Sequence, residues 1–132
     1  MTDIQRRATK YTTELQTILQ HLGHATNAQI AYELRKNYPD VSCTTVHRVT
    51  QRLAADGQIG MAPQAEDGSV RYDNNTKPHD HFLCTNCHKL RDINTPGNCR
   101  KLLQQELGGC TIEGSLTVSG VCPNCNNPQN NQ

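Results

Sequence analysis

The sequence predicts an α+β fold in two small parts, three helices followed by a mixed helix-and-strand part that a metal holds together. Apolar residues recur at helical spacing three times before Gly57, and short strand-like runs follow it. Two Cys-x-x-Cys pairs then stand on either side of residues 88–121. The chain has 132 residues, 34% of them hydrophobic, with one Phe and no Trp. Each part therefore has a thin core, which a metal site can reinforce.

Three helices are expected in the front part. The first spans about residues 5–22, where apolar residues share one face. Thr26 or Asn27 can cap the second, because a side-chain oxygen there accepts a free backbone N–H of the first turn. Ser42 can cap the third, and Gly57 lies just past its end. Helical spacing and caps therefore agree on three short helices.

After the third helix, residues 58–61 and 69–72 are short strand candidates, and the Glu-Asp-Gly at 66–68 suits a turn between them. Three helices followed by such a hairpin is the element order of a winged helix-turn-helix, a DNA-binding fold. Its third helix enters the major groove and its hairpin lies along the DNA backbone. A helical domain with another purpose gives the same pattern and stays an alternative.

The rear part begins after a polar segment at residues 74–78, which is expected to form a hinge. Beyond it we expect strands at 81–84 and 89–93, a helix at about 98–107, and a strand or hairpin within 110–121. So small a unit would gain core and cover its sheet edge by pairing with a second copy. The predicted organisation is a DNA-binding domain at 1–73, the hinge at 74–78, and a dimerisation and metal-binding domain at 79–132.

Four cysteines form two knuckles, Cys84 with Cys87 and Cys122 with Cys125. Four thiolates at this spacing are typical of a closed tetrahedral zinc site that contributes to folding. A redox dithiol pair and an iron–sulfur cluster use similar cysteines and stay as alternatives. The seven Cys are an odd number, which fits thiolate ligands in a reducing cytoplasm better than secreted disulfides. The cysteines without metal-like spacing are expected to be small buried residues: Cys43, Cys99 and Cys110.

A second group of metal-ligand types surrounds the first knuckle. His79 and His81 alternate with Asp80, so in a strand both imidazoles project to one face while Asp80 points the other way. Asp73 and Asp92 add carboxylates, and this nitrogen and oxygen set suits Fe(II), Mn(II) or Zn(II). A solvated pair is the commoner explanation of His-x-His alone. If a metal binds, its ligands would span the hinge and fix the two parts relative to each other.

The basic charge belongs to the front of the chain. Residues 1–55 carry seven Lys/Arg against four acids, a balance of +3, whereas the rest carries six against eight, a balance of −2. No run approaches the ~20 apolar residues that a membrane span needs, and the N-terminus has no apolar signal-peptide core. No membrane partner is therefore expected.

Several segments resemble the ferric uptake regulator family of metal-dependent repressors, and the resemblance covers nearly the whole chain. They are residues 42–48 (Ser-Cys-Thr-Thr-Val-His-Arg), 71–73 (Arg-Tyr-Asp), 79–87 (His-Asp-His-Phe-Leu-Cys-x-x-Cys) and 120–125 (Gly-Val-Cys-x-x-Cys). The resemblance implies a homodimer with an N-terminal winged helix and a C-terminal dimerisation domain. It also implies that the four-cysteine Zn2+ is structural.

Within the family, the chain is most similar to the peroxide-responsive repressors. Their regulatory metal site implies five ligands here: His24, Asp73, His79, His81 and Asp92. The iron-uptake branch typically has Glu at the two Asp positions, and the zinc-uptake branch typically has a Cys near the hinge. In the peroxide sensors, bound Fe(II) reacts with hydrogen peroxide and oxidises a ligand His, for which His24 and His79 are the candidates. Without the resemblance, a His such as His24 in a Gly-His-Ala turn is usually an ordinary solvated residue.

The resemblance also implies DNA contacts from the first and third helices. The candidates are Lys10, Thr44, Thr45, His47, Arg48 and Arg52. Each could instead be an ordinary solvated side chain. His47 stands where the family usually has a Tyr that touches bases, and His88 replaces the usual Gly after the first knuckle. A two-fold dimer implies double-stranded DNA with a pseudo-palindromic operator.

These observations predict a cytoplasmic, homodimeric transcriptional repressor that carries structural Zn2+ and regulatory Fe2+ or Mn2+ and performs no enzyme turnover. An iron-, manganese- or zinc-responsive uptake regulator without peroxide chemistry is the first alternative. A zinc-dependent hydrolase using His79, His81 and an Asp is disfavoured, because five protein ligands leave little room for water. A zinc-stapled protein-interaction module is the last alternative.

Overall fold

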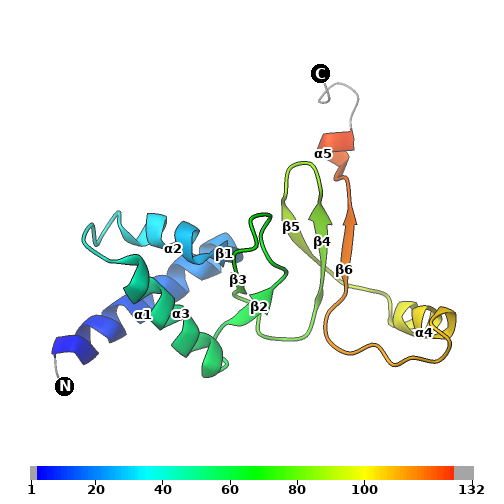
Figure 1. Cartoon of the computed structure of the whole chain (residues 1–132), viewed down its shortest axis with the longest axis horizontal. Coiled ribbons are helices and arrows are strands. Elements are labelled where there is room, and N and C mark those ends of the chain that lie inside the picture. The colour runs from blue at the N-terminus through cyan, green and yellow to red at the C-terminus, as the bar shows by residue number, and fades with distance from the viewer. Residues whose placement is uncertain (1–2, 127–132) are drawn as a thin grey trace. The chain divides into compact units, whose positions relative to one another are not determined.

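The computed structural model describes residues 3–126, with side chains from residue 10 onward. The chain divides into two units, Met1–Lys77 and Pro78–Gln132 (Figure 1). Within the described residues, no helix is both long enough and apolar enough to cross a membrane. The predicted assignment of DNA binding to residues 1–73 and of dimerisation to residues 79–132 stays a prediction.

The N-terminal unit contains the three expected helices, α1 (Asp3–Leu22), α2 (Asn27–Leu34) and α3 (Cys43–Ala55). Thr26 caps α2 in a reciprocal pair with Gln29, and the Ser42 hydroxyl accepts the Thr45 N–H at the start of α3. Both caps match the predicted start signals. The helices enclose an aliphatic core that includes Leu15, Leu19, Ile30, Leu34, Val46 and Leu53.

A small sheet completes this unit, with strands β1 (His24–Thr26), β2 (Gly60–Ala62) and β3 (Arg71–Asp73) in the order β1-β3-β2. Both pairings are antiparallel. The predicted hairpin is present, although its strands begin two residues later than expected. The predicted turn at His24 is wrong, because His24 begins β1. Gly23, with φ +80°, ends α1 and redirects the chain alongside β3.

The C-terminal unit contains strands β4 (Asp80–Cys84), β5 (Leu90–Ile93) and β6 (Thr117–Gly120), with helices α4 (Gly97–Glu106) and α5 (Pro123–Asn126). Strand β4 is central, antiparallel to β5 and parallel to β6. The expected strand or hairpin within 110–121 is a single strand. Because β4 and β6 are parallel, their C-terminal ends lie at the same end of the sheet, where Cys84 pairs with Gly120.

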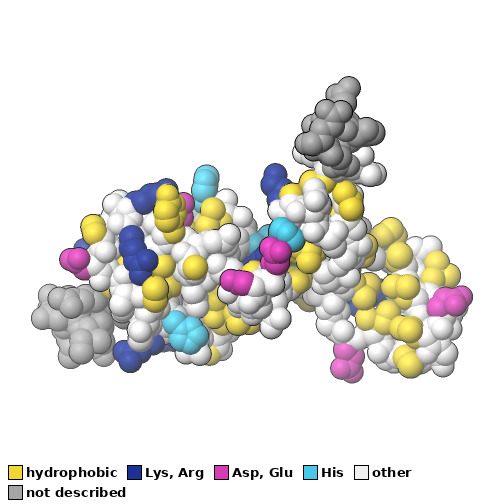
Figure 2. Space-filling model, turned by 45° about the horizontal axis from the view of Figure 1, so that its top comes forward, with side chains coloured by type: hydrophobic (Ala, Val, Ile, Leu, Met, Phe, Trp, Pro, Cys, Tyr) yellow, Lys and Arg dark blue, Asp and Glu magenta, His cyan; other side chains and the backbone are white. Residues whose placement is uncertain are grey.

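Helix α4 contains no buried residue. Leu102 and Leu103 within it, and Leu107 at its end, are 43–55% exposed, and Figure 2 shows hydrophobic side chains gathered over this part of the unit. A short segment joins β5 to α4, and a longer loop leads from α4 to β6 (Figure 1). The unit therefore leaves the leucines of this helix largely exposed.

Candidate metal centres and nucleic-acid interface

The two cysteine knuckles come together at the end of the parallel strands. Cys84 ends β4, and Cys122 follows β6 by two residues. The Thr85 N–H donates to the Gly120 carbonyl at 2.7 Å, which extends the β4–β6 pairing into both knuckles. The Sγ atoms of all four cysteines, Cys84, Cys87, Cys122 and Cys125, lie within 4.8 Å of one another.

This cluster fits zinc. Zn–S bonds of about 2.3 Å in a tetrahedron place neighbouring sulfur atoms roughly 3.8 Å apart. The Sγ atoms of Cys87 and Cys122 are 3.8 Å apart. The set contains only sulfur, closes four positions and leaves none open for a substrate, as in structural zinc sites.

Backbone N–H groups favour the thiolate form of two of the four cysteines, Cys84 and Cys122. Cys84 is fully buried, and its Sγ accepts the N–H groups of Cys122 and Cys87, each at 3.4 Å. These hydrogen bonds lower the pKa of the Cys84 thiol to about 5. A hydrogen bond from the Cys125 N–H likewise lowers the pKa of Cys122. Thiolates are the form in which cysteine binds a metal.

The backbone at His88 explains why glycine is usual after the first knuckle. His88 has φ +63°, the left-handed conformation that side chains with a Cβ disfavour by about 1–2 kcal/mol. Its N–H donates to the Cys84 carbonyl at 2.9 Å and closes the knuckle turn. The sequence alone offered no account of this residue, and the structure shows that it occupies a glycine-type position.

The prediction that the other three cysteines are buried is wrong. Cys43 and Cys110 are exposed, and Cys99 is half-buried. Cys43 is the first residue of α3, where the side chain faces solvent, and its Sγ accepts a hydrogen bond from Arg35 Nη2 at 3.2 Å. Cys110 follows two glycines in a loop. Local position overrides the usual preference of cysteine for the interior.

Two of the five predicted regulatory ligands lie together in the N-terminal unit. The antiparallel register places His24 of β1 directly opposite Asp73 of β3, and His24 Nε2 lies 3.5 Å from Asp73 Oδ2. On the other side of β3, Gly60 faces Asp73, and the absence of a side chain leaves room for the Asn75 carbonyl. Asp73 Oδ1 accepts the Asn75 N–H at 2.9 Å, which holds the carboxylate in place.

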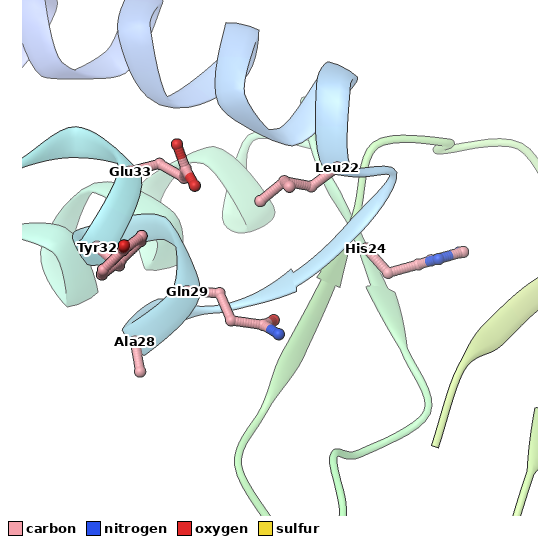
Figure 3. A pocket seen from close by; sticks show the side chains of 6 residues that line it. All are labelled: Leu22, His24, Ala28, Gln29, Tyr32 and Glu33. Carbon is pink, nitrogen blue, oxygen red and sulfur yellow. The ribbon is translucent and has the colours of Figure 1, made fainter. Parts of the chain in front are cut away.

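A groove of about 410 Å³ lies beside His24 and is lined by Leu22, His24, Ala28, Gln29, Tyr32 and Glu33. In Figure 3 the His24 ring extends away from the α2 side chains rather than toward them. Glu33, the carboxylate of this groove, is paired with Lys36 Nζ at 2.9 Å. The groove therefore does not join His24 and Glu33 into an acid–base pair.

The other three predicted regulatory ligands lie together in the C-terminal unit. His79 Nε2 and His81 Nε2 lie 3.3 and 3.4 Å from the same atom, Asp92 Oδ1. His81 stands opposite Asp92 in the β4–β5 register, and the His79 ring lies 4.5 Å from the His81 ring. Metal bonds of about 2.1 Å place neighbouring ligand atoms roughly 3.0–3.4 Å apart, so these spacings suit a shared metal.

Asp80, between the two histidines, points the other way and anchors the strand. Its carboxylate accepts hydrogen bonds from the Leu116 N–H at 2.8 Å, from Arg100 Nη2 at 2.7 Å and from the Thr95 hydroxyl. The Leu116 N–H, first, and then the Thr95 hydroxyl hold the pKa of Asp80 below its usual value. Asp80 thereby ties β4 to the segments that lead into α4 and β6.

We expect Asp80→Ala to destabilise the C-terminal unit by about 2–4 kcal/mol, because it leaves a backbone N–H and a guanidinium without their buried acceptor. Arg100→Ala is the matched control and should cost about 1 kcal/mol, since Arg100 is partly exposed. Urea unfolding of the zinc-loaded variants measures both. Equal losses for the two variants would contradict the anchoring role of Asp80.

The predicted DNA contacts lie on α1 and α3 of the N-terminal unit. On α3, Thr44, His47, Arg48 and Arg52 are exposed, whereas the Thr45 hydroxyl is engaged by the Ser42 side chain at 3.0 Å. On α1, Lys10 Nζ lies 4.8 Å from the centre of the Tyr38 ring, a cation–π contact. Five of the six side chains therefore face solvent, and Thr45 acts at the helix cap. Their contact with DNA stays a prediction.

Three packed helices, a hairpin wing and a four-cysteine centre define a metal-binding protein of the winged helix-turn-helix class. The model of the ferric uptake regulator family matches residues 4–111 of this chain. The chain therefore belongs to the ferric uptake regulator family, and it is a transcriptional regulator rather than an enzyme. This membership confirms the predicted fold class and excludes the hydrolase alternative. The family consists of DNA-binding, dimeric regulators.

Individual relatives agree with this assignment. The peroxide operon regulator of Bacillus subtilis is 27% identical over 118 residues, which cover 88% of this chain and 81% of that protein. The Helicobacter pylori ferric uptake regulator matches 91% of this chain with a TM-score of 0.74 at 20% identity, over 82% of its own length. The Campylobacter jejuni peroxide stress regulator matches 95% of this chain and all of its own length, with a TM-score of 0.69 at 21% identity.

Proposed function

We propose that this protein is a metal-dependent repressor that releases DNA when hydrogen peroxide oxidises one of its own metal ligands. The observation that carries the proposal is the pair of half-sites, His24 with Asp73 in one unit and His79, His81 and Asp92 in the other. Each half-site combines imidazole with carboxylate. Neither contains sulfur, which favours Fe(II) or Mn(II) over the zinc of the cysteine cluster.

The two half-sites together would hold one metal ion. A half-site of two or three ligands binds metal weakly, whereas five ligands would hold it firmly and still leave one octahedral position open. Binding would then favour the arrangement of the units in which all five ligands converge. A repressor needs such a two-state element, because a ligand shifts an equilibrium only by its difference in affinity for the two states.

Fe(II) held by these residues would supply the one-electron chemistry that makes hydrogen peroxide reactive beside the ligands. His24 and His79 are the residues we expect to be oxidised. The chain would thereby record peroxide irreversibly on its own side chain. The name of the Bacillus subtilis relative, a peroxide operon regulator, supports this choice within the family.

A regulator of iron, manganese or zinc uptake without peroxide chemistry is the alternative function. The donor set allows it, because His/Asp sites accept several divalent metals. The solved relative from Helicobacter pylori is itself a ferric uptake regulator. The reaction with peroxide, rather than the fold, separates the two functions.

The functional form is proposed to be a homodimer on a pseudo-palindromic operator. The order β5-β4-β6 leaves β5 and β6 as edge strands, and the exposed leucines of α4 together with Val118 and Val121 form unpacked apolar surface. A second copy would cover both features. A two-fold protein then presents one α3 helix to each half of the operator DNA. Action in the cytoplasm stays a prediction from cysteine usage.

The test is anaerobic binding to duplex DNA selected by the protein, with Fe(II) or with Mn(II), before and after a low dose of peroxide. We expect peroxide to abolish binding of the Fe(II) form only, and peptide mass analysis to find one added oxygen on His24 or His79. Mn(II) is the control, because it occupies the same donors without this reaction. Binding that needs metal but survives peroxide would establish the uptake regulator instead.

A further inference from the structure

A chain of three polar side chains crosses the interface between α2 and α3. Thr50 of α3 is fully buried, and its Oγ1 lies 2.8 Å from Asn27 Oδ1. Asn27 begins α2 and is half-buried, and its Nδ2 lies 3.2 Å from His47 Nδ1. His47 is exposed on α3. The chain of contacts therefore runs from the core to a residue that the proposed function places on DNA.

The hydrogen-bond roles along this chain follow from the atoms. The Thr50 hydroxyl has one proton and three oxygen neighbours: Asn27 Oδ1 at 2.8 Å, the His47 carbonyl at 3.0 Å and the Val46 carbonyl at 3.2 Å. Donation along the shortest contact makes the Asn27 amide oxygen the acceptor. The amide nitrogen then faces His47, and an amide nitrogen only donates.

The orientation of Asn27 selects the tautomer of His47. Nδ1 of His47 must accept the Asn27 proton, so the neutral imidazole carries its own proton on Nε2. An exposed Nε2–H is a hydrogen-bond donor. In the major groove a donor matches N7 and O6 of guanine, N7 of adenine and O4 of thymine, and it does not match the amino group of cytosine. Guanine is the best match, because it alone offers two adjacent acceptors.

We propose that Asn27 and Thr50 are positioning residues that fix His47 as a donor for guanine, and that this network sets one position of the operator. The proposal rests on the proposed function, because it assumes that α3 reads DNA. His47 supplies the contact with the base. Asn27 and Thr50 act through it, by holding the ring in place and keeping its proton on Nε2.

The experiment begins with the Mn(II)-loaded full chain and a random duplex library, from which the bound sequence is selected. Dissociation constants are then measured for that sequence and for each single base-pair change, at one salt concentration. The variants are His47→Ala, Asn27→Ala, Thr50→Val and the double variant His47→Ala with Asn27→Ala. Asn37→Ala is the matched control, since it removes an amide side chain in the turn after α2 whose hydrogen bond, to Glu14 Oε1 of α1 at 2.8 Å, does not involve α3.

We expect the unmodified chain to bind roughly ten- to hundredfold more weakly when one particular G·C pair in each half of the operator is changed. His47→Ala and Asn27→Ala should each remove that discrimination and no other. The double variant should be no worse than His47→Ala, because the two residues act as one unit. Thr50→Val should lose part of the discrimination, and Asn37→Ala should lose none.

Two results would overturn the inference while leaving the proposed function intact. One is a metal-dependent operator whose base preferences are unchanged by Asn27→Ala. The other is a uniform loss of affinity across all sequences in Asn27→Ala, which would mean a purely structural role. If the Mn(II)-loaded chain selects no sequence at all, the proposed function itself fails and the inference fails with it.

Discussion

His24→Ala is expected to abolish the metal dependence of DNA binding while leaving the zinc centre in place. In the unmodified chain we expect Mn(II) to tighten DNA binding by roughly 10–100-fold, the usual size of a coupling between two sites. In the variant, Mn(II) should give no measurable tightening. His24 is the residue of the N-terminal unit that offers an imidazole beside Asp73, so its loss leaves that half-site with a carboxylate alone.

The fold itself should tolerate the change. His24 is not part of the aliphatic core, and the pairing of β1 with β3 uses backbone groups that Ala retains. His21→Ala is the matched control, since His21 is an exposed His in the last turn of α1. Fluorescence anisotropy on labelled duplex, with zinc content measured on the same samples, separates the outcomes. Metal-dependent binding that survives in His24→Ala would defeat the two-half-site proposal.

Cys84→Ser is expected to have the largest effect on stability of any single substitution. Cys84 is fully buried at the end of the central strand, and its sulfur accepts two backbone N–H groups as well as being a zinc ligand candidate. The serine side chain is shorter than that of cysteine, and its oxygen is a harder donor and a poor zinc ligand. We therefore expect most of the bound zinc to be lost and the thermal midpoint of the C-terminal unit to fall by more than ~10 °C.

Cys43→Ser is the control for this substitution. It removes a thiol of the same kind from an exposed position outside the cluster. Zinc measured by mass spectrometry under native conditions should stay at one ion per chain in Cys43→Ser. A Cys84→Ser protein that keeps its full zinc and its thermal midpoint would show that the four cysteines do not form the structural centre.

Much of the fold follows from local sequence signals. The starts of α2 and α3 were predictable because Thr26 and Ser42 each satisfy a backbone N–H that a helix start leaves open. The missed strand β1 has no such signal. It is three residues long, and its partner β3 lies more than 40 residues away, so its conformation is set by the packing of a distant segment. Single-sequence patterns carry no information about such pairing.

The candidate sites divide in the same way. Sulfur ligands were evident because each Cys-x-x-Cys knuckle is local, whereas the meeting of the two knuckles depends on the parallel pairing of β4 with β6. The role of Thr50 was not visible, since a threonine within a helical pattern has no distinguishing neighbour. Its partner Asn27 is 23 residues away and was noted only as a possible cap. Buried polar contacts between helices require the three-dimensional structure.

The last two cysteines of the zinc cluster follow the parallel strand β6, near the end of the described chain. They are therefore synthesised after nearly all of the other residues that fold. The N-terminal unit has all of its core residues once residue 77 has emerged from the ribosome, well before the last cysteines are made available. The C-terminal unit lacks half of its sulfur ligands until Cys122 and Cys125 have emerged from the ribosome. The supply of zinc therefore acts on the last step of maturation, and a cell short of zinc would accumulate chains whose helical unit is folded while their C-terminal unit is incomplete.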